Sequence, residues 1–160
     1  MLIWAISAAL VVIFDQVAKI LVMHNIGPTD CFHIIPGLFD FVYVKNTGAA
    51  FSILSNNTGL LSIVSIVFCV GVLWYWYKTK PASTLLKLSL CLLFAGALGN
   101  AIDRIFRGFV VDFISTAFME FPVFNIADIA ITFGAALLII YFIFFDKEDE
   151  NGESNTSQSY

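Results

Sequence analysis

Residues 58–77 read TGLLSIVSIVFCVGVLWYWY, twenty consecutive positions without a charged side chain. A helix needs about 20 mostly apolar residues to cross the hydrocarbon core of a bilayer, and this stretch supplies them. It ends in the aromatic cluster 74–77, and tryptophan and tyrosine are typical anchors at a membrane interface. The stretch therefore predicts a transmembrane helix.

The composition of the whole chain is typical of a membrane protein. Of its 160 residues, 59% are hydrophobic and only 12% are charged, and the mean hydropathy is +0.89. A soluble domain carries about 25% charged residues. The composition therefore excludes a disordered chain, a basic nucleic-acid-binding protein and an ordinary cytosolic enzyme. The net charge of -4 is concentrated in 146–153, where five acids accompany one lysine.

Three further apolar runs bring the predicted number of spans to four. They cover 1–23, 88–102 and 123–145. The first is expected to be retained rather than cleaved as a secretion signal, because no positive charge precedes it and no small-residue cleavage site follows it. We predict an all-α membrane protein with a single four-span domain over 1–145. The polar residues 146–160 are expected to form a disordered cytoplasmic tail.

The expected orientation depends on the short turn at 78–87. This turn carries three lysines and no acid, a pattern that the positive-inside rule places in the cytoplasm. Both termini would then be cytoplasmic, and the two larger loops would be extracytoplasmic. The number of lysines and arginines at the two ends of the spans does not favour either orientation. The prediction therefore depends on the absence of acids from the turn. The cations near the opposite face are Lys19, Lys45, Arg104 and Arg107.

The cysteines and histidines predict neither a disulfide framework nor a metal site. Cys69 and Cys91 lie inside apolar runs, where cysteine behaves as a small buried hydrophobe. Cys31, His24 and His33 lie near one another in the sequence, but they lack the ligand spacing of a tetrahedral zinc site. We therefore expect no metal and no other cofactor.

Charged residues within apolar runs are informative, because a charge at the centre of a membrane helix costs about 2.5–3.5 kcal/mol on insertion scales. Asp15 and Lys19 are four positions apart on one helical face, so we expect them to pair. The pair either neutralises itself and fixes the outer end of the first span, or it supports a nearby site.

The segment 96–104, GALGNAIDR, combines small residues with polar ones. Its glycines and alanines would let a second helix approach closely. Asn100, Asp103 and Arg104 follow at spacings of three and four, which places them on one face of the helix. The segment predicts a polar-lined cavity at the outer end of the third span, with simple helix capping as the alternative.

Two further acids lie beside or inside apolar stretches. Asp112 lies in VVDFI (110–114), and Asp128 lies about five residues inside the fourth span. The loop that holds Asp112 leads directly into that span, so both carboxylates lie on the same side of the membrane. Two poorly solvated carboxylates share a proton, and the resulting acid and base can activate water to hydrolyse a peptide bond. The residues alone leave a proton-relay or ion-binding role and a structural role open.

In these motifs the chain resembles the lipoprotein signal peptidases, or signal peptidase II, a family of membrane aspartyl proteases. The similar stretches occur in the family's order and cover the chain from Met1 to about Phe145. One departure is Ala95, where the family often has a glycine, and it affects packing only. The stretches are DQVAK (15–19), NTGAAF (46–51), GALGNAIDR (96–104), VVDF (110–113) and FNIAD (124–128).

The resemblance implies that Asp112 and Asp128 form a catalytic dyad, which activates water to cut a prolipoprotein on the amino side of its lipid-modified cysteine. It implies a small sheet cradle in the first outer loop, where the strand formers 39–44 lie. The active site would face the outer surface of a bacterial cytoplasmic membrane. Asp15 and Lys19 would support the first span beside the cavity. The residues implied to line the site and hold the substrate are Asn46, Asn100, Arg104 and Asn125.

The expected partners are prolipoproteins that carry a diacylglyceryl group and membrane lipids, with no nucleic acid and no obligate protein partner. A rival prediction is a small proton- or ion-coupled membrane transporter. That class would favour interrupted helices, polar residues near the midplane and repeated halves, whereas the acids here cluster at one end of the spans. A non-enzymatic assembly protein would leave the polar cluster unexplained.

Overall fold

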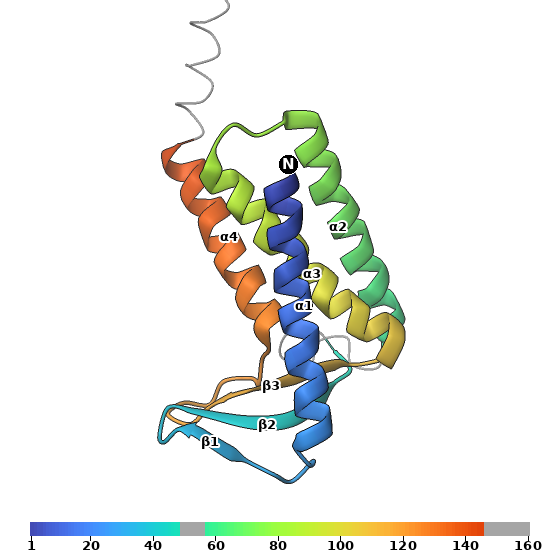
Figure 1. Cartoon of the computed structure of the whole chain (residues 1–160), viewed down its shortest axis with the longest axis vertical. Helices are drawn as coiled ribbons and strands as arrows, with labels where there is room; N and C mark the ends of the chain where they lie inside the picture. Colours follow the sequence, from blue (N-terminus) through green and yellow to red (C-terminus); the bar gives the residue numbers. More distant parts are fainter. Residues whose placement is uncertain (49–56, 146–160) are drawn as a thin grey trace, which may run out of the picture.

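The computed structural model describes residues 1–48 and 57–145. Four long helices run along the molecule, and a small sheet lies at one end (Figure 1). Each helix is long and apolar enough to cross a membrane, so the prediction of an all-α membrane protein with four spans is confirmed. The helices are α1 (Leu2–Asn25), α2 (Thr58–Thr79), α3 (Thr84–Arg107) and α4 (Ile126–Phe144).

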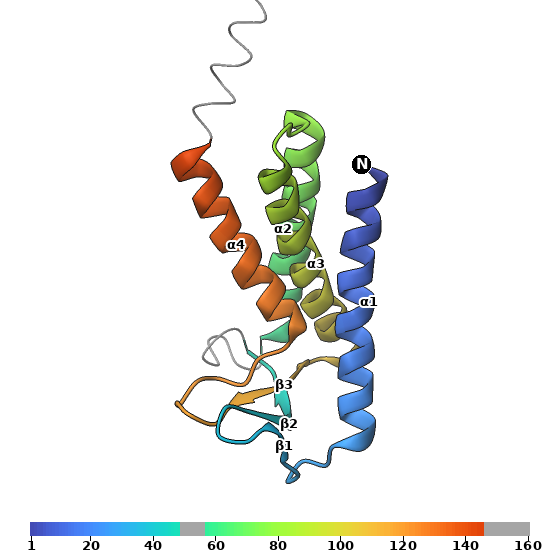
Figure 2. The same cartoon turned by 60° about the vertical axis from the view of Figure 1, so that its left-hand side comes forward.

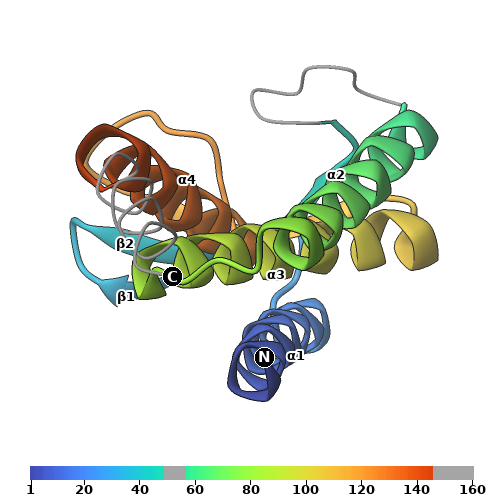
Figure 3. The same cartoon turned by 90° about the horizontal axis from the view of Figure 1, so that it is seen from above.

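Helix α3 is the centre of the bundle. Seen from above, it lies between α1 on one side and α2 and α4 on the other (Figure 3). Its most apolar window is 61% buried, against 22% or less for the other three helices. The outward faces of those helices carry many large exposed apolar side chains. These faces are suited to lipid, because lipid tails are as apolar as leucine.

Close contact between α3 and α4 depends on glycines. A Cβ atom on Gly96 would overlap the backbone carbonyl oxygen of Ala127. On α4, a Cβ atom on Gly134 would lie 2.9 Å from the backbone nitrogen of Leu93. Small residues let membrane helices approach to backbone contact, as predicted for 96–104.

The sheet has three antiparallel strands in the order β1-β2-β3. Strands β1 (Phe32–Ile35) and β2 (Phe39–Asn46) form a hairpin after α1, and β3 (Val110–Thr116) follows α3. The strand expected at 39–44 is therefore confirmed. The sheet was expected in the first outer loop alone, but its third strand lies in the connection between α3 and α4. The β-branched residues of β3 favour a strand. Pairing with β2 gives the backbone of this short segment its hydrogen-bond partners.

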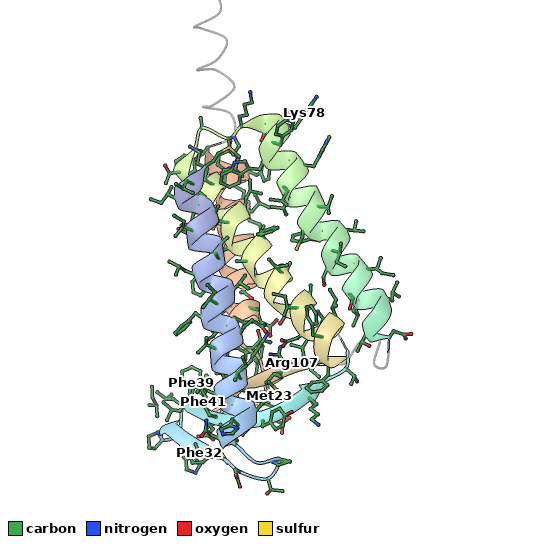
Figure 4. All side chains as sticks on the ribbon, turned by 45° about the vertical axis from the view of Figure 1, so that its right-hand side comes forward. Met23, Phe32, Phe39, Phe41, Lys78 and Arg107 are labelled. Carbon is green, nitrogen blue, oxygen red and sulfur yellow. The ribbon has the colours of Figure 1, made fainter. Side chains whose placement is uncertain are left out.

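Apolar side chains join the sheet to the bundle. Val22 and Ile26 at the end of α1 pack with Val111 and Phe113 of β3. Phe41 of β2 meets Phe113 edge-on, with ring centroids 5.5 Å apart, and Figure 4 shows Phe41 beside the same end of α1. This cluster holds β3, and with it Asp112, against the ends of the helices.

The boundaries of α3 and α4 differ most from the predicted spans, and α3 begins at Thr84, before the predicted position 88. Helix α3 continues past the predicted end to Arg107, and Gly108, with φ of 77°, ends it. Helix α4 begins at Ile126, because the backbone of Phe124 is hydrogen-bonded to β3 instead of continuing into the helix. Asp128 therefore lies in the first turn of α4 and not five residues inside the span, as expected from the sequence.

Three chain segments lie at the end of the bundle opposite the sheet. They are the N-terminus, the turn between α2 and α3, and the last turn of α4 (Figures 1 and 2). Lys78 marks this end in Figure 4. The lysine-bearing turn and the outermost ends of α1 and α4 thus share one face, and the two larger connections share the other. The predicted tail at 146–160 lies outside the described residues.

Candidate active site

Asp112 lies near the middle of β3, with 2% of the residue exposed. Both of its carboxylate oxygens accept hydrogen bonds from asparagine side chains. The Asn46 amide on β2 donates to Oδ2 at 2.8 Å, and the Asn125 amide donates to Oδ1 at 2.7 Å. Sheet pairing places Asn46 opposite Val110, so the register of β2 against β3 brings the first of these donors to the carboxylate.

Asp128 lies in the first turn of α4, where the helix dipole favours a negative charge. Its Oδ2 accepts a hydrogen bond from the backbone nitrogen of Asn125 at 3.1 Å, and Asn125 Oδ1 accepts one in return from the backbone nitrogen of Asp128 at 2.9 Å. This reciprocal capping box fixes the start of the helix. The other oxygen, Oδ1, accepts a hydrogen bond from the Asn100 side chain of α3 at 2.7 Å.

The two carboxylates belong to one hydrogen-bonded unit. The Asn125 amide that contacts Asp112 also lies 3.2 Å from Asn100 Oδ1, and Asn100 in turn donates to Asp128. The pKa of Asp112 is raised to about 6, because burial and the nearby charge of Asp128 outweigh the hydrogen bonds from Asn46 and Asn125, which lower it. A carboxyl group of this kind exchanges its proton near neutral pH, which suits general acid–base chemistry.

Lys19 lies directly behind this unit and is fully buried. Its Nζ lies 2.9 Å from Asp15 Oδ2 and 3.0 Å from Asp103 Oδ2, and it donates to Asn100 Oδ1 at 3.0 Å. The predicted Asp15–Lys19 pair is confirmed. Because Lys19 occupies the oxygen of the Asn100 amide, the nitrogen of that amide is left to face Asp128.

Asp15 also contacts the helix that carries Asp128. Its Oδ1 accepts a hydrogen bond from the backbone nitrogen of Ala127 at 3.0 Å, which is one of the free donors at the start of α4. Gly99 permits this approach, because a Cβ atom there would lie 2.8 Å from Asp15 Oδ2. The pair on α1 is therefore joined to both α3 and α4.

Asp103 departs from its predicted place on the cavity-lining face. It turns toward α1, because Lys19 and Arg107 form ion pairs with its carboxylate there. Its Oδ2 also accepts a hydrogen bond from the backbone nitrogen of Val111 at 3.1 Å, the residue before Asp112. Asp103 therefore fixes β3 from behind and does not line the cavity.

Gln16 and Arg107 belong to the same buried network, which the sequence did not predict for them. The Gln16 amide nitrogen lies within 3.2 Å of acceptors on Asp15, Gly99 and Asp103, and Arg107 donates to Gln16 Oε1 at 2.9 Å. Figure 4 shows Arg107 where α3 reaches the sheet. The sequence feature that could have predicted part of this network is the four-residue spacing of Asp103 and Arg107, because that spacing favours an ion pair on a helix.

A cavity of about 1100 Å³ opens in front of the two aspartates. Its polar wall includes Asn46, Asn100 and Arg104 beside the two carboxylates. Much of the remaining wall is apolar and comes from α2, α4 and the segment before α4. Its apolar members are Val44, Val64, Phe68, Ala97, Val110, Phe121, Pro122, Val123, Phe124, Ile129, Ile131 and Phe133.

Arg104 is the basic residue of α3 that lines this cavity. Its Nη2 donates to the backbone oxygen of Gly48 at 3.1 Å. Its Nε is buried and has no hydrogen-bond partner among the described residues. An unpaired buried donor is costly, so Nε is positioned to receive an acceptor atom from a bound molecule.

The structure thus brings the predicted site residues together at the sheet end of the bundle. The two acids and three of the four polar residues line one cavity, whereas Asn125, which was also expected to line it, is fully buried and contacts both acids. The Asp15–Lys19 pair lies behind the cavity. Positions 49–51 of the NTGAAF motif lie outside the described residues. The roles of these side chains stay predictions. The four polar residues are Asn46, Asn100, Arg104 and Asn125.

Residues 7–144 match the family model for signal peptidase (SPase) II. The chain belongs to the signal peptidase II family. Lipoprotein signal peptidases from Staphylococcus aureus strains JH9 and Newman are each 41% identical to this chain over 135 residues, which cover 83% of this chain and 83% of each relative.

Two solved structures have the same fold, and both are described as bacterial membrane enzymes determined by the in meso method. The one at 2.3 Å resolution has a TM-score of 0.86 and 37% identity, and the match covers 89% of this chain and 88% of that chain. The one at 1.9 Å resolution has a TM-score of 0.83 and 37% identity, and the match covers 91% and 95%. As a member of the signal peptidase II family, this chain is a membrane protease that removes signal peptides in the inner membrane of a bacterium.

Proposed function

We propose that this chain is an aspartyl endopeptidase that cuts diacylglyceryl-modified prolipoproteins on the amino side of the lipidated cysteine. The observation that carries the proposal is the placement of two aspartates, the buried Asp112 and the half-buried Asp128, in one asparagine-linked unit beside an apolar cavity. Signal peptidase II membership and the relatives named as lipoprotein signal peptidases support the substrate class.

The proposed reaction uses the two carboxyl groups as a base and an acid. The ionised carboxylate takes a proton from water while the water oxygen attacks the carbonyl carbon of the scissile peptide. The protonated carboxyl group gives its proton to the carbonyl oxygen, which yields a tetrahedral intermediate. Collapse of this intermediate breaks the C–N bond as a proton passes to the leaving amine. The raised pKa of Asp112, about 6, favours sharing of one proton by the pair.

The polar residues around the dyad have distinct proposed tasks. Asn46, Asn100 and Asn125 hold the carboxylate oxygens in place by donating hydrogen bonds. Arg104 offers to a carbonyl oxygen of the substrate backbone its Nε, which has no partner in the described ranges 1–48 and 57–145. Lys19 acts from behind Asn100 and does not touch substrate.

The apolar wall suits a lipid-modified substrate. The acyl chains of a diacylglyceryl group remain in the hydrocarbon, so the cysteine that carries them is held at the membrane interface. The cavity is lined by apolar residues of α2 and α4, including Phe68 and Phe133, and its carboxylates lie at the sheet end of these helices. A substrate that enters laterally would therefore present its scissile bond at the depth of the dyad.

We also propose that the sheet end is extracytoplasmic and that both termini are cytoplasmic. The acid-free lysine turn lies opposite the sheet (Figure 4), and positive charge of this kind is retained in the cytoplasm. Labelling with a membrane-impermeant amine reagent tests this orientation in intact cells. Lys45 on β2 is expected to react, whereas Lys78 should react only after the membrane is opened, and the opposite pattern would reverse the orientation.

The proposed cleavage is tested with purified protein in detergent and two precursors, one lipidated and one not. We expect the wild type to cut only the lipidated precursor, and a chelator to leave the rate unchanged. Asp128→Asn should lose about 10²–10⁴-fold in rate while still binding the precursor. Asp30→Asn, on the exposed connection before β1, is the matched control and should cut normally. Normal cleavage by Asp128→Asn would refute the dyad.

A further inference from the structure

Three metal-binding side chains meet on the outer hairpin, away from the dyad. The thiol of Cys31, the imidazole of His33 and the carboxylate of Asp40 each place a ligand atom within 4.8 Å of the other two. The sequence argued against a metal site here, because Cys31, His24 and His33 lack the ligand spacing of a tetrahedral zinc site. The third ligand comes from the neighbouring strand, which sequence spacing does not reveal.

Strand register explains the meeting of these three residues. His33 on β1 pairs directly with Asp40 on β2, and directly paired residues of antiparallel strands point to the same face of a sheet. Cys31 precedes His33 by two positions, which places it on that same face. His33 Nδ1 lies 2.7 Å from Asp40 Oδ1, so two of the ligand atoms already share one proton.

We propose that Cys31, His33 and Asp40 form a Zn²⁺ site with three protein ligands and a fourth position open to water. Thiolate, imidazole and carboxylate are the ligand types that zinc uses in proteins. Bond lengths of about 2.0–2.3 Å imply ligand separations of roughly 3.3–3.8 Å in a tetrahedral site. The Cys31 sulfur must therefore approach the other ligand atoms by up to about 1 Å, whereas His33 Nδ1 and Asp40 Oδ1, now 2.7 Å apart, must separate by roughly 0.6–1.1 Å. Side-chain rotation can supply both movements, because Cys31 and His33 are exposed.

The charges of the cluster match a divalent cation. Binding of Zn²⁺ releases the thiol proton, and the neutral His33 ring binds through Nδ1 with its own proton on Nε2. The thiolate and the carboxylate then balance the two positive charges of the ion.

The other cysteines do not compete for this role. Cys69 and Cys91 are buried among helices, where Cys69 Sγ contacts the Phe94 carbonyl at 3.9 Å and Cys91 Sγ contacts the Trp4 carbonyl at 3.4 Å. Cys31 is the exposed cysteine of the chain. A thiolate–metal signal from the folded protein therefore reports on Cys31.

The proposed zinc would stabilise the hairpin and take no part in cleavage. Asp40 lies near the start of β2, and Asn46, which contacts Asp112, ends it. Six residues of strand separate them by roughly 20 Å. The ion would instead join the edge strand β1 to β2, where the pairing is irregular between His33 and Ile35.

The test is cobalt and zinc binding by the purified full chain. Co²⁺ is expected to bind with a thiolate-to-metal absorption band, and one equivalent of Zn²⁺ should displace it. Cys31→Ser should abolish the band, and Asp40→Asn should weaken Zn²⁺ binding by about 100-fold or more, since even the outer contacts of metal sites contribute 10–100-fold. His24→Gln, at the end of α1 and outside the cluster, is the matched control and should bind like the wild type.

A second measurement uses the unmodified protein, so it does not depend on the folding of a variant. Zn²⁺ should protect Cys31 from a hydrophilic maleimide, and removal of Zn²⁺ by a chelator should restore the reaction. Absence of a thiolate band in the wild type, or equal Zn²⁺ affinity in wild type and Cys31→Ser, would overturn the proposal. If Zn²⁺ were bound only by the dyad carboxylates, the wild type and Cys31→Ser would bind it with equal affinity.

Discussion

The side-chain amide of Asn125 donates a hydrogen bond to Asp112 across 2.7 Å. The family resemblance implied only that this asparagine would line the site and hold the substrate. The structure shows that its backbone nitrogen and side-chain oxygen bond to Asp128 while its side-chain nitrogen contacts the other aspartate. One residue therefore sets the position of both carboxyl groups.

These two tasks of Asn125 can be separated by substitution. Asn125→Ser keeps a good N-cap oxygen but loses the donor to Asp112, so we expect near-normal stability with cleavage reduced by about 10–100-fold, the worth of a hydrogen bond to a charged group. Asn125→Ala loses both and should also destabilise the protein by about 1 kcal/mol. Cleavage rates and thermal unfolding of the two variants provide the comparison, and full activity in Asn125→Ser would contradict the assignment.

Cleavage should depend on pH through Asp112. Its pKa lies at about 6, so deprotonation above that value removes the proton that the dyad shares, and with it the acid of the pair, and activity should fall on the alkaline side with a midpoint near pH 6. The Asn46 hydrogen bond stabilises the ionised carboxylate and lowers this pKa. Asn46→Ala should therefore move the midpoint upward, by roughly one unit. A pH–rate profile of both proteins tests the sign, and a downward shift would contradict it.

Lys19 should contribute strongly to stability. Replacing it by methionine leaves the buried carboxylates of Asp15 and Asp103 without this shared cation, and loss of one partner of a buried ion pair costs about 3–5 kcal/mol. We expect Lys19→Met to unfold at a lower temperature in detergent and to lose activity. Lys78→Met, at the exposed end of α2, should unfold like the wild type, and similar unfolding of both variants would argue against the buried network.

Glycine contacts between α3 and α4 set the position of Asp128. A Cβ atom on Gly96 would overlap the Ala127 carbonyl oxygen, immediately before Asp128. Gly96→Ala should push α4 away from α3, with a loss of about 1–3 kcal/mol typical of overpacking, and it should slow cleavage. Gly71→Ala on α2 meets no atom within 4 Å and should leave both properties unchanged. Thermal unfolding and cleavage assays of this matched pair test the packing.

Several features were predictable because they depend on residues near one another in the chain. The four spans follow from the length and apolarity of each run, and the Asp15–Lys19 pair follows from its four-residue spacing. The strand at 39–44 follows from its aromatic and β-branched residues. The start of α4 was placed too early, because hydropathy does not distinguish an apolar residue in a helix from one paired to a strand.

By itself the sequence determined that the chain enters the membrane four times and that Asp112 and Asp128 are the acids at one end of the spans. Only the tertiary structure decided which amide holds which carboxylate, that Asp103 turns away from the cavity to Lys19, and that Asp40 joins Cys31. The physical reason is that hydrophobicity and helix spacing act within a segment. Contacts between segments depend instead on how closely helices pack at their glycines and on the register of paired strands.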